Sequence, residues 1–254
     1  MIKRLKNLIR KNEKLIGLYR KLVFFENFCS KDILDFKKLM LFSKVYPYTM
    51  LSYQRLSNIY DLSKLIESQK RGGAFVECGA WKGGCAAVMA FVAEKAKSNR
   101  KVWLFDSFEG LPEPTNKDGL FAKEYSSGKT FGNLAKINIL VGLVEDVKKI
   151  FFSILKINKE NTVIKKGWFQ NTLPEARDKI GNIAILHLDG DWYESTKFCL
   201  DNLYNNVIEG GYVIIDDYYY LEGCRKAVDE FFKERNIKAD LIKIDEAGAY
   251  FKKS

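Results

Sequence analysis

The sequence predicts an α/β fold built on a mostly parallel β-sheet. Two short runs of Ile, Leu and Val, Ile183–Asp191 and Gly210–Tyr218, stop abruptly at acidic residues. Runs of this kind, bounded by glycine and charge, are typical of strands that are buried on both faces of a parallel sheet. From Ala74 onward, strand-like runs alternate with helical patterns, as they do in strand–helix–strand units. One α/β domain therefore accounts for most of the chain.

Four aspartates, Asp189, Asp191, Asp216 and Asp217, close these two runs. Adjacent parallel strands end at the same edge of a sheet, where open α/β sheets bind their ligands. Four carboxylates at one edge repel each other unless a cation or a shared proton offsets them, and a divalent hard metal ion is the simplest explanation. Two alternatives stay open. Asp189 and Asp191 could cap the next helix, and Asp216 and Asp217 could form a solvated turn.

Length and composition indicate one globular domain with additions. The chain has 254 residues, of which 47% are hydrophobic. No stretch approaches the ~20 apolar residues of a membrane span, and no signal peptide is recognisable. The five cysteines are scattered without a C-x-x-C pair. This odd number argues against a disulfide framework, so we expect a cytoplasmic protein.

Basic charge is concentrated at the N-terminus. Residues 1–25 contain eight bases and one acid, so the rest of the chain contributes only about +3 to the net charge of +10. We therefore expect no binding of nucleic acid by the domain. Apolar residues recur at helical spacing among these bases, which predicts a basic amphipathic helix. It could rest on anionic lipid at the inner membrane face, or pack on its own domain or a second subunit, and we expect a homo-oligomer.

Periodicity predicts the remaining elements. Helices are expected at Lys31–Phe42, Leu51–Gln69, after Gly84, near the end of Asn138–Leu155, and at Glu175–Ile180, Ser195–Tyr204 and Gly223–Arg235. Further strands are expected from Ala74, at Lys101–Asp106 and from Asn161, with a closing hairpin of Asp240–Ile244 and Ala249–Phe251. Pro112–Gly132 is polar with little periodicity, which predicts a mobile lid or substrate loop.

The first strand leads into a glycine-bearing turn with Gly79, Gly83 and Gly84. Glycines there let the backbone approach a ligand that faces a helix N-terminus. Asp106 closes the second strand, a position suited to hydrogen bonding a ribose diol. Together these features predict a nucleoside-containing cofactor. Because the pattern is not G-x-G-x-x-G, a tight turn without a ligand is the alternative.

Six segments in order resemble the macrocin O-methyltransferase (TylF-like) family. They are Tyr48–Met50, Glu77–Gly84, Asp106–Pro112, Gly167–Pro174, Leu186–Thr196 and Gly210–Tyr218. The resemblance implies a Rossmann-like class I methyltransferase sheet of seven strands, six of them parallel, with an antiparallel C-terminal hairpin edge. It also divides the chain into a basic N-terminal helical extension, residues 1–45, and an S-adenosylmethionine-dependent methyltransferase domain, residues 46–254.

The resemblance implies a role for each matching residue. Asp189, Asp216 and Asp217 correspond to metal ligands, and Asp191 corresponds to the general base. The implied cofactor-binding residues are Thr49, Met50, Glu77, Gly79, Asp106, Ser107 and, beside the adenine, Trp168. Cys85 stands where the family usually has a small Ser, Ala or Thr. We expect His187 to be a buried structural histidine, with a catalytic role as the alternative, and Tyr218–Tyr220 either to wall the acceptor pocket or to pack their loop.

The activity that the resemblance implies is S-adenosylmethionine- and Mg²⁺-dependent O-methylation of a small-molecule sugar: a nucleotide sugar, a glycoside or a surface glycan. A sugar hydroxyl is a poor nucleophile, and Mg²⁺ held by carboxylates would activate it. Two neighbouring hydroxyls would chelate the ion, so a vicinal diol is expected. The alternatives are a catechol-type small-molecule O-methyltransferase, an RNA methyltransferase, which the charge distribution argues against, and a non-catalytic membrane-associated binding module.

Overall fold

A seven-stranded sheet forms the centre of the computed structural model, which describes residues 21, 24–25, 30–126 and 140–254. The strand order is β3-β2-β1-β4-β5-β7-β6. The strands are β1 Ala74–Cys78, β2 Val102–Asp106, β3 Thr162–Lys166, β4 Ile183–Leu188, β5 Val207–Ile215, β6 Ile242–Lys243 and β7 Ala249–Lys252. β1 to β5 pair in parallel, whereas β7 is antiparallel to both β5 and β6. The predicted mostly parallel sheet with an antiparallel hairpin edge is therefore confirmed.

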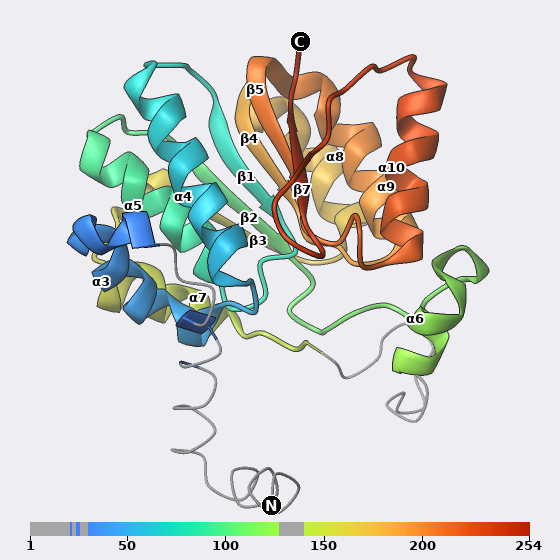
Figure 1. Cartoon of the computed structure of the whole chain (residues 1–254), viewed down its shortest axis with the longest axis horizontal. Helices are drawn as coiled ribbons and strands as arrows, with labels where there is room; N and C mark the ends of the chain where they lie inside the picture. Colours follow the sequence, from blue (N-terminus) through green and yellow to red (C-terminus); the bar gives the residue numbers. More distant parts are fainter. Residues whose placement is uncertain (1–20, 22–23, 26–29, 127–139) are drawn as a thin grey trace, which may run out of the picture.

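Helices cover both faces of this sheet (Figure 1). On one side lie α3 Phe36–Val45, α4 Tyr53–Ser68, α5 Gly84–Ala96 and α7 Val144–Lys148; on the other lie α8 Phe169–Ile180, α9 Tyr193–Leu203 and α10 Glu222–Glu234. Each layer has its own hydrophobic core. Successive side chains of a strand point to opposite faces, so Phe75 of β1 joins the first core and its neighbour Val76 joins the second. Burial on both faces explains why these strands read as continuous apolar runs.

The helical pattern predicted at Lys31–Phe42 divides in two. A short 3₁₀ helix, η1 Ser30–Leu34, precedes α3, and Asp35 between them accepts a hydrogen bond from the Lys38 backbone N–H at 3.0 Å. Lys38 is buried on α3, and its Nζ lies 3.0 Å from Asp32 Oδ1 and 2.6 Å from Ser57 Oγ of α4. An aspartate that caps a new helix explains the break.

The predicted basic helix of residues 1–25 lies almost wholly outside the described residues. Its contact with a membrane or a second subunit stays a prediction, as does the domain boundary after residue 45. α3, which precedes that boundary, packs Leu41, Phe42 and Val45 into the core that α4 and α5 share. In the described part of the chain, no helix is both long and apolar enough to cross a membrane.

Two further predictions can be compared with the structure. That Pro112–Gly132 is a lid or substrate loop stays a prediction, whereas the expected start of a helix at Glu175 is wrong. The segment Pro112–Gly132 contains a 3₁₀ turn, η3 Asn116–Asp118, and a helix, α6 Gly119–Ser126, while residues 127–139 lie outside the described part. α8 starts at Phe169 and not at Glu175, so Pro174 sits inside the helix. Leu173 and Ala176 are fully buried in the second core, and this burial outweighs the unfavourable proline.

Candidate active site

A cleft of about 460 Å³ opens at the C-terminal ends of β1, β2, β4 and β5. All eleven residues singled out from the sequence line it: Thr49, Met50, Glu77, Gly79, Asp106, Ser107, Trp168, Asp189, Asp191, Asp216 and Asp217. The structure thus brings together residues that are spread over more than half of the chain. Their individual roles stay predictions.

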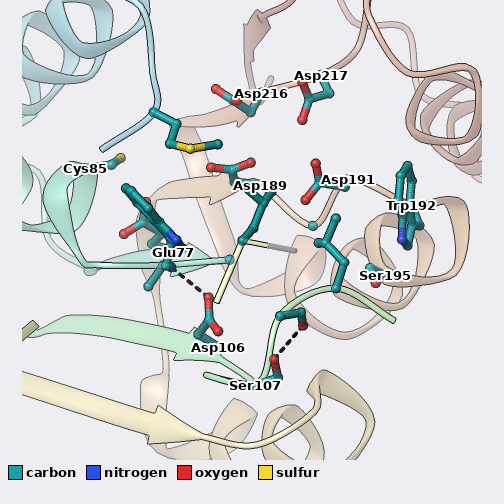
Figure 2. A pocket seen from close by; sticks show the side chains of 18 of the residues that line it. Glu77, Cys85, Asp106, Ser107, Asp189, Asp191, Trp192, Ser195, Asp216 and Asp217 are labelled. Atoms are coloured by element: carbon teal, nitrogen blue, oxygen red, sulfur yellow. Dashed lines mark hydrogen bonds between the residues drawn. The ribbon is translucent and has the colours of Figure 1, made fainter. Parts of the chain in front are cut away.

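The four aspartates gather on one side of the cleft (Figure 2). β4 and β5 are adjacent and parallel, with Leu188 opposite Ile215, so the residues that follow both strands emerge side by side. One carboxylate oxygen each from Asp189, Asp191 and Asp217 lie within 4.8 Å of one another, and Asp216 forms a second such group with Asp189 and His187.

The alternatives to an acidic cluster do not match this geometry. α9 begins after Trp192, and its first backbone N–H, that of Tyr193, donates to Asp118 Oδ1 at 2.6 Å, so the carboxylate at this helix start comes from Asp118 and not from Asp189 or Asp191. Asp191 instead adopts a left-handed backbone with φ +58°. Asp216 is buried, with 5% of its surface exposed, which excludes a solvated turn.

Burial makes this cluster unfavourable when every member is ionised. The pKa values of Asp189 and Asp217 are raised well above their ordinary value, first by burial and then by the nearby charge of Asp216. The same two causes raise the pKa of Asp191 to about 7. Asp216 Oδ1 is buried and has no hydrogen-bond partner among the described residues. The carboxylate oxygens of this cluster, one of them without a hydrogen-bond partner, and their mutual repulsion fit a hard divalent cation such as Mg²⁺.

His187 lies behind the wall of the cleft and is completely buried. Its Nδ1 is 3.2 Å from both Glu77 Oε1 and Cys85 Sγ, and its Nε2 is 3.7 Å from Asp216 Oδ1. Burial alone would lower the pKa of the imidazole, but its interactions with Asp216 and Glu77 outweigh burial and raise the pKa to about 10. The histidine is therefore a buried cation between two acids. This fits the expectation of a buried structural histidine.

Glu77 and Asp106 fix the glycine-bearing turn on the other side of the cleft. Glu77 Oε2 accepts a hydrogen bond from Ala86 N–H of α5 at 2.9 Å. The Asp106 carboxylate accepts N–H hydrogen bonds from Trp81 at 2.7 Å and Phe108 at 2.6 Å. Burial raises the pKa of Asp106 to about 6. Both acids thus hold the loop that borders the cleft.

The first glycine of this turn serves a close backbone contact. A Cβ on Gly79, whose φ is +96°, would lie 1.7 Å from the carbonyl oxygen of Asp189. We expected a glycine here for the approach of a ligand; the structure shows that packing of the β1 and β4 ends already requires it. A Cβ on Gly84 would likewise lie 2.5 Å from the carbonyl oxygen of Tyr48, next to Thr49.

Apolar and aromatic side chains also line the cleft, and Tyr220 adjoins the acidic cluster, since its backbone N–H donates to the Asp217 carbonyl oxygen at 3.1 Å. Phe121 of α6 and Tyr220 line the cleft, and their rings pack edge to face with centroids 5.4 Å apart. Tyr218 packs its loop, because its hydroxyl donates a hydrogen bond to Asp229 at 2.7 Å. Of the two alternatives for these tyrosines, Tyr220 fits the one in which it lines the pocket, and Tyr218 fits the one in which it packs its loop. Sequence reasoning missed Phe121, which lies in a segment without clear periodicity.

Sequence reasoning also missed Arg55 of α4. Its Nη1 donates a hydrogen bond to Asp216 Oδ2, and its Nε lies 3.1 Å from Asp245 Oδ2 in the turn between β6 and β7. A single arginine within a helical pattern gives no local signal of such a role.

The family model described as macrocin O-methyltransferase (TylF) matches residues 43–253. The chain belongs to the macrocin O-methyltransferase family. This membership makes it an S-adenosylmethionine-dependent O-methyltransferase, as the sequence motifs predicted. The match includes both acidic strand ends and the glycine-bearing turn.

Named relatives support the same family. Demethyldecarbamoylnovobiocin O-methyltransferase of Streptomyces niveus is 33% identical over 233 residues, covering 90% of this chain and 86% of the relative. The 8-demethyl-8-(2,3-dimethoxy-alpha-L-rhamnosyl)-tetracenomycin-C 4'-O-methyltransferase of Streptomyces olivaceus is 32% identical, covering 81% and 75%. The solved structure of the O-methyltransferase NovP matches with a TM-score of 0.71 at 34% identity, covering 82% of each chain.

The raised pKa values of Asp189, Asp191 and Asp217 predict how the stability of this methyltransferase depends on pH. Between about pH 4 and 7 the folded protein holds protons on these acids that the unfolded chain has lost, so the free energy of unfolding falls as pH rises. Urea unfolding in EDTA at several pH values measures this slope. Mg²⁺ should flatten it, because a bound cation favours the ionised acids. Metal-free stability that rises over this range would contradict the assignment.

Proposed function

We propose that the enzyme methylates a hydroxyl of a small-molecule sugar, with Mg²⁺ bound at the acidic cluster. The observation that carries this proposal is the convergence of Asp189, Asp191 and Asp217 within 4.8 Å at one end of a cleft whose other end carries the glycine-bearing turn and Asp106. The names of two relatives support it, since one acts on a novobiocin precursor and the other on a rhamnosyl-bearing tetracenomycin.

In this proposal the cofactor lies along the ends of β1 and β2. Asp106 lines the cleft while its carboxylate is fixed by two backbone N–H groups, so its remaining lone pairs are preorganised to accept from a ribose diol. Thr49 and Met50 border the cleft next to Gly84, and Trp168 offers its indole to an adenine. S-adenosylmethionine supplies an electrophilic methyl group, and the cleft contributes orientation.

Asp189, Asp216 and Asp217 would hold the metal ion, and Asp191 would serve as the general base. Mg²⁺ at these carboxylates would supply a Lewis acid that makes a sugar hydroxyl more acidic. Asp191 would take the proton of that hydroxyl on a carboxylate oxygen. The left-handed backbone at Asp191 directs the carboxylate into the cluster.

A catechol-type phenol is the second candidate acceptor. The aromatic pair of Phe121 and Tyr220 beside the cluster would suit a planar ring as well as the apolar face of a sugar. Incubation with labelled S-adenosylmethionine and a panel of glycosides, sugar nucleotides and catechols, each with and without chelator, separates the two. Transfer to catechols alone would reject the sugar proposal, and transfer unaffected by chelator would reject the metal.

Replacement of the proposed base tests the role of Asp191. Asp191→Asn should lower kcat by roughly 10²–10⁴-fold, because the amide cannot take a proton. Cofactor affinity, measured by calorimetry with S-adenosylhomocysteine, should stay within a few-fold of the wild type. Asp178→Asn, at a side chain that is 87% exposed, is the matched control and should change neither quantity. If the asparagine variant at position 191 turns over normally, the base lies elsewhere.

Truncation of the aromatic wall tests the acceptor side. Phe121→Ala should raise KM for the acceptor by roughly 5–10-fold through lost ring contacts, with little change in KM for the cofactor. Leu120→Ala is the matched control, since Leu120 precedes Phe121 on α6, is 76% exposed and does not line the cleft. Equal effects of the two substitutions would show that α6 as a whole, not the ring, matters.

A further inference from the structure

Arg55 joins three parts of the molecule. It is the third residue of α4, and its side chain is 15% exposed where it reaches the cleft. Its Nη1 donates to Asp216 Oδ2, and its Nε donates to Asp245 Oδ2 at 3.1 Å. One guanidinium therefore connects α4, the acidic strand end of β5 and the turn between β6 and β7.

The charge of Arg55 stands out against its surroundings. Among the described residues that line the cleft, Arg55 is the only base, and the acids are Glu77, Asp106, Asp189, Asp191, Asp216 and Asp217. Acids at such density in a buried place oppose one another unless a cation lies among them. Arg55 is the permanent cation that faces this side of the cluster, because a guanidinium stays protonated at any physiological pH.

The two oxygens of the Asp216 carboxylate have different surroundings. Oδ2 is occupied by Arg55, whereas Oδ1 is buried, has no hydrogen-bond partner in the described part of the chain and lies 3.7 Å from His187 Nε2. The arginine thus fixes the orientation of the carboxylate through one oxygen and leaves the other for a further partner.

Arg55 is itself held from two directions. Asp245 Oδ1 accepts hydrogen bonds from Ala247 N–H at 2.9 Å and Gly248 N–H at 2.8 Å, which fixes the turn. Ser52, the cap of α4, donates to Asp245 Oδ2 at 2.5 Å. A Cβ on Gly248 would lie only 2.9 Å from Arg55 Cδ, so the turn packs directly on the side chain. This arrangement preorganises the guanidinium.

We propose that Arg55 is the resident counter-ion of the acidic cluster and the positioning residue of Asp216. It stabilises the cluster before a divalent cation binds, and it presents Asp216 Oδ1 to that cation. Only the identity of the cation rests on the proposed function; the counter-ion role concerns the chain's own residues. A purely structural bridge between α4 and the turn would have the same contacts, and the following experiment separates the two roles.

Thermal unfolding of the full chain in EDTA and in Mg²⁺ is measured for Arg55→Gln, Arg55→Lys and the wild type. Glutamine can hydrogen-bond Asp216 but is uncharged, whereas lysine keeps the charge and loses the planar fork. Arg100→Gln is the matched control. Arg100 is also a buried arginine, its Nε lies 2.6 Å from Glu67 Oε1, and neither residue lines the cleft.

Loss of the counter-ion should lower the Tm of Arg55→Gln by roughly 10 °C in EDTA and much less in Mg²⁺, because the added cation replaces the lost charge. Arg55→Lys should keep most of the wild-type Tm in EDTA. The Tm of Arg100→Gln should fall below that of the wild type by the same amount in both buffers.

Three results would overturn the proposal: equal losses for Arg55→Gln in both buffers when Mg²⁺ stabilises the wild type, a lysine variant as unstable in EDTA as the glutamine variant, or a glutamine variant unfolded in both buffers. A wild type that Mg²⁺ does not stabilise would reject the metal assignment instead. The comparison of lysine with glutamine in EDTA would still decide the role of Arg55.

Discussion

The parallel pairing of β4 with β5 is the constraint on which the site depends. It places Asp189 and Asp216 at the same edge of the sheet, because Leu188 and Ile215 stand opposite each other at the ends of the two strands. The free energy for this arrangement comes from the apolar strand residues, which are buried on both faces. The hydrophobic core thus stabilises an arrangement of acids that would be unfavourable by itself. A functional cluster can persist in this way, at the cost of repulsion that a cation relieves.

Two basic side chains flank Asp216 and show how the chain offsets part of this repulsion. His187 approaches Oδ1 from within β4, and Arg55 binds Oδ2 from α4. The histidine also contacts Glu77, so one chain of interactions runs from the glycine-bearing turn to the acidic strand ends. The two sides of the cleft are connected through buried polar groups, which places the cofactor side and the metal side of the proposed reaction on one rigid framework.

Much of this framework could be predicted from local sequence signals. Apolar runs that end in aspartate predicted β4, β5 and their shared edge, and six ordered motifs supplied the role expected of each matching residue. Arg55 could not be predicted, because its partners Asp216 and Asp245 lie 161 and 190 residues away and nothing near it in the sequence refers to them. Phe121 was missed for a similar reason. The short α6 that carries it follows Asp118, whose Oδ1 accepts a hydrogen bond from Tyr193 N–H, 75 residues away. The start of α8 was misplaced because the proline signal is local, whereas the burial that overrides it is tertiary.

Diffraction from crystals grown with S-adenosylhomocysteine and soaked in Mn²⁺ would show whether the acidic cluster holds a metal ion beside the cofactor. Manganese prefers the same oxygen ligands as magnesium and scatters anomalously, so its position is independent of model building. We predict one anomalous peak bounded by carboxylate oxygens of Asp189, Asp216 and Asp217, next to the bound nucleoside. A cofactor-bound crystal without a peak at this edge of the sheet, or with these oxygens directed apart, would contradict it.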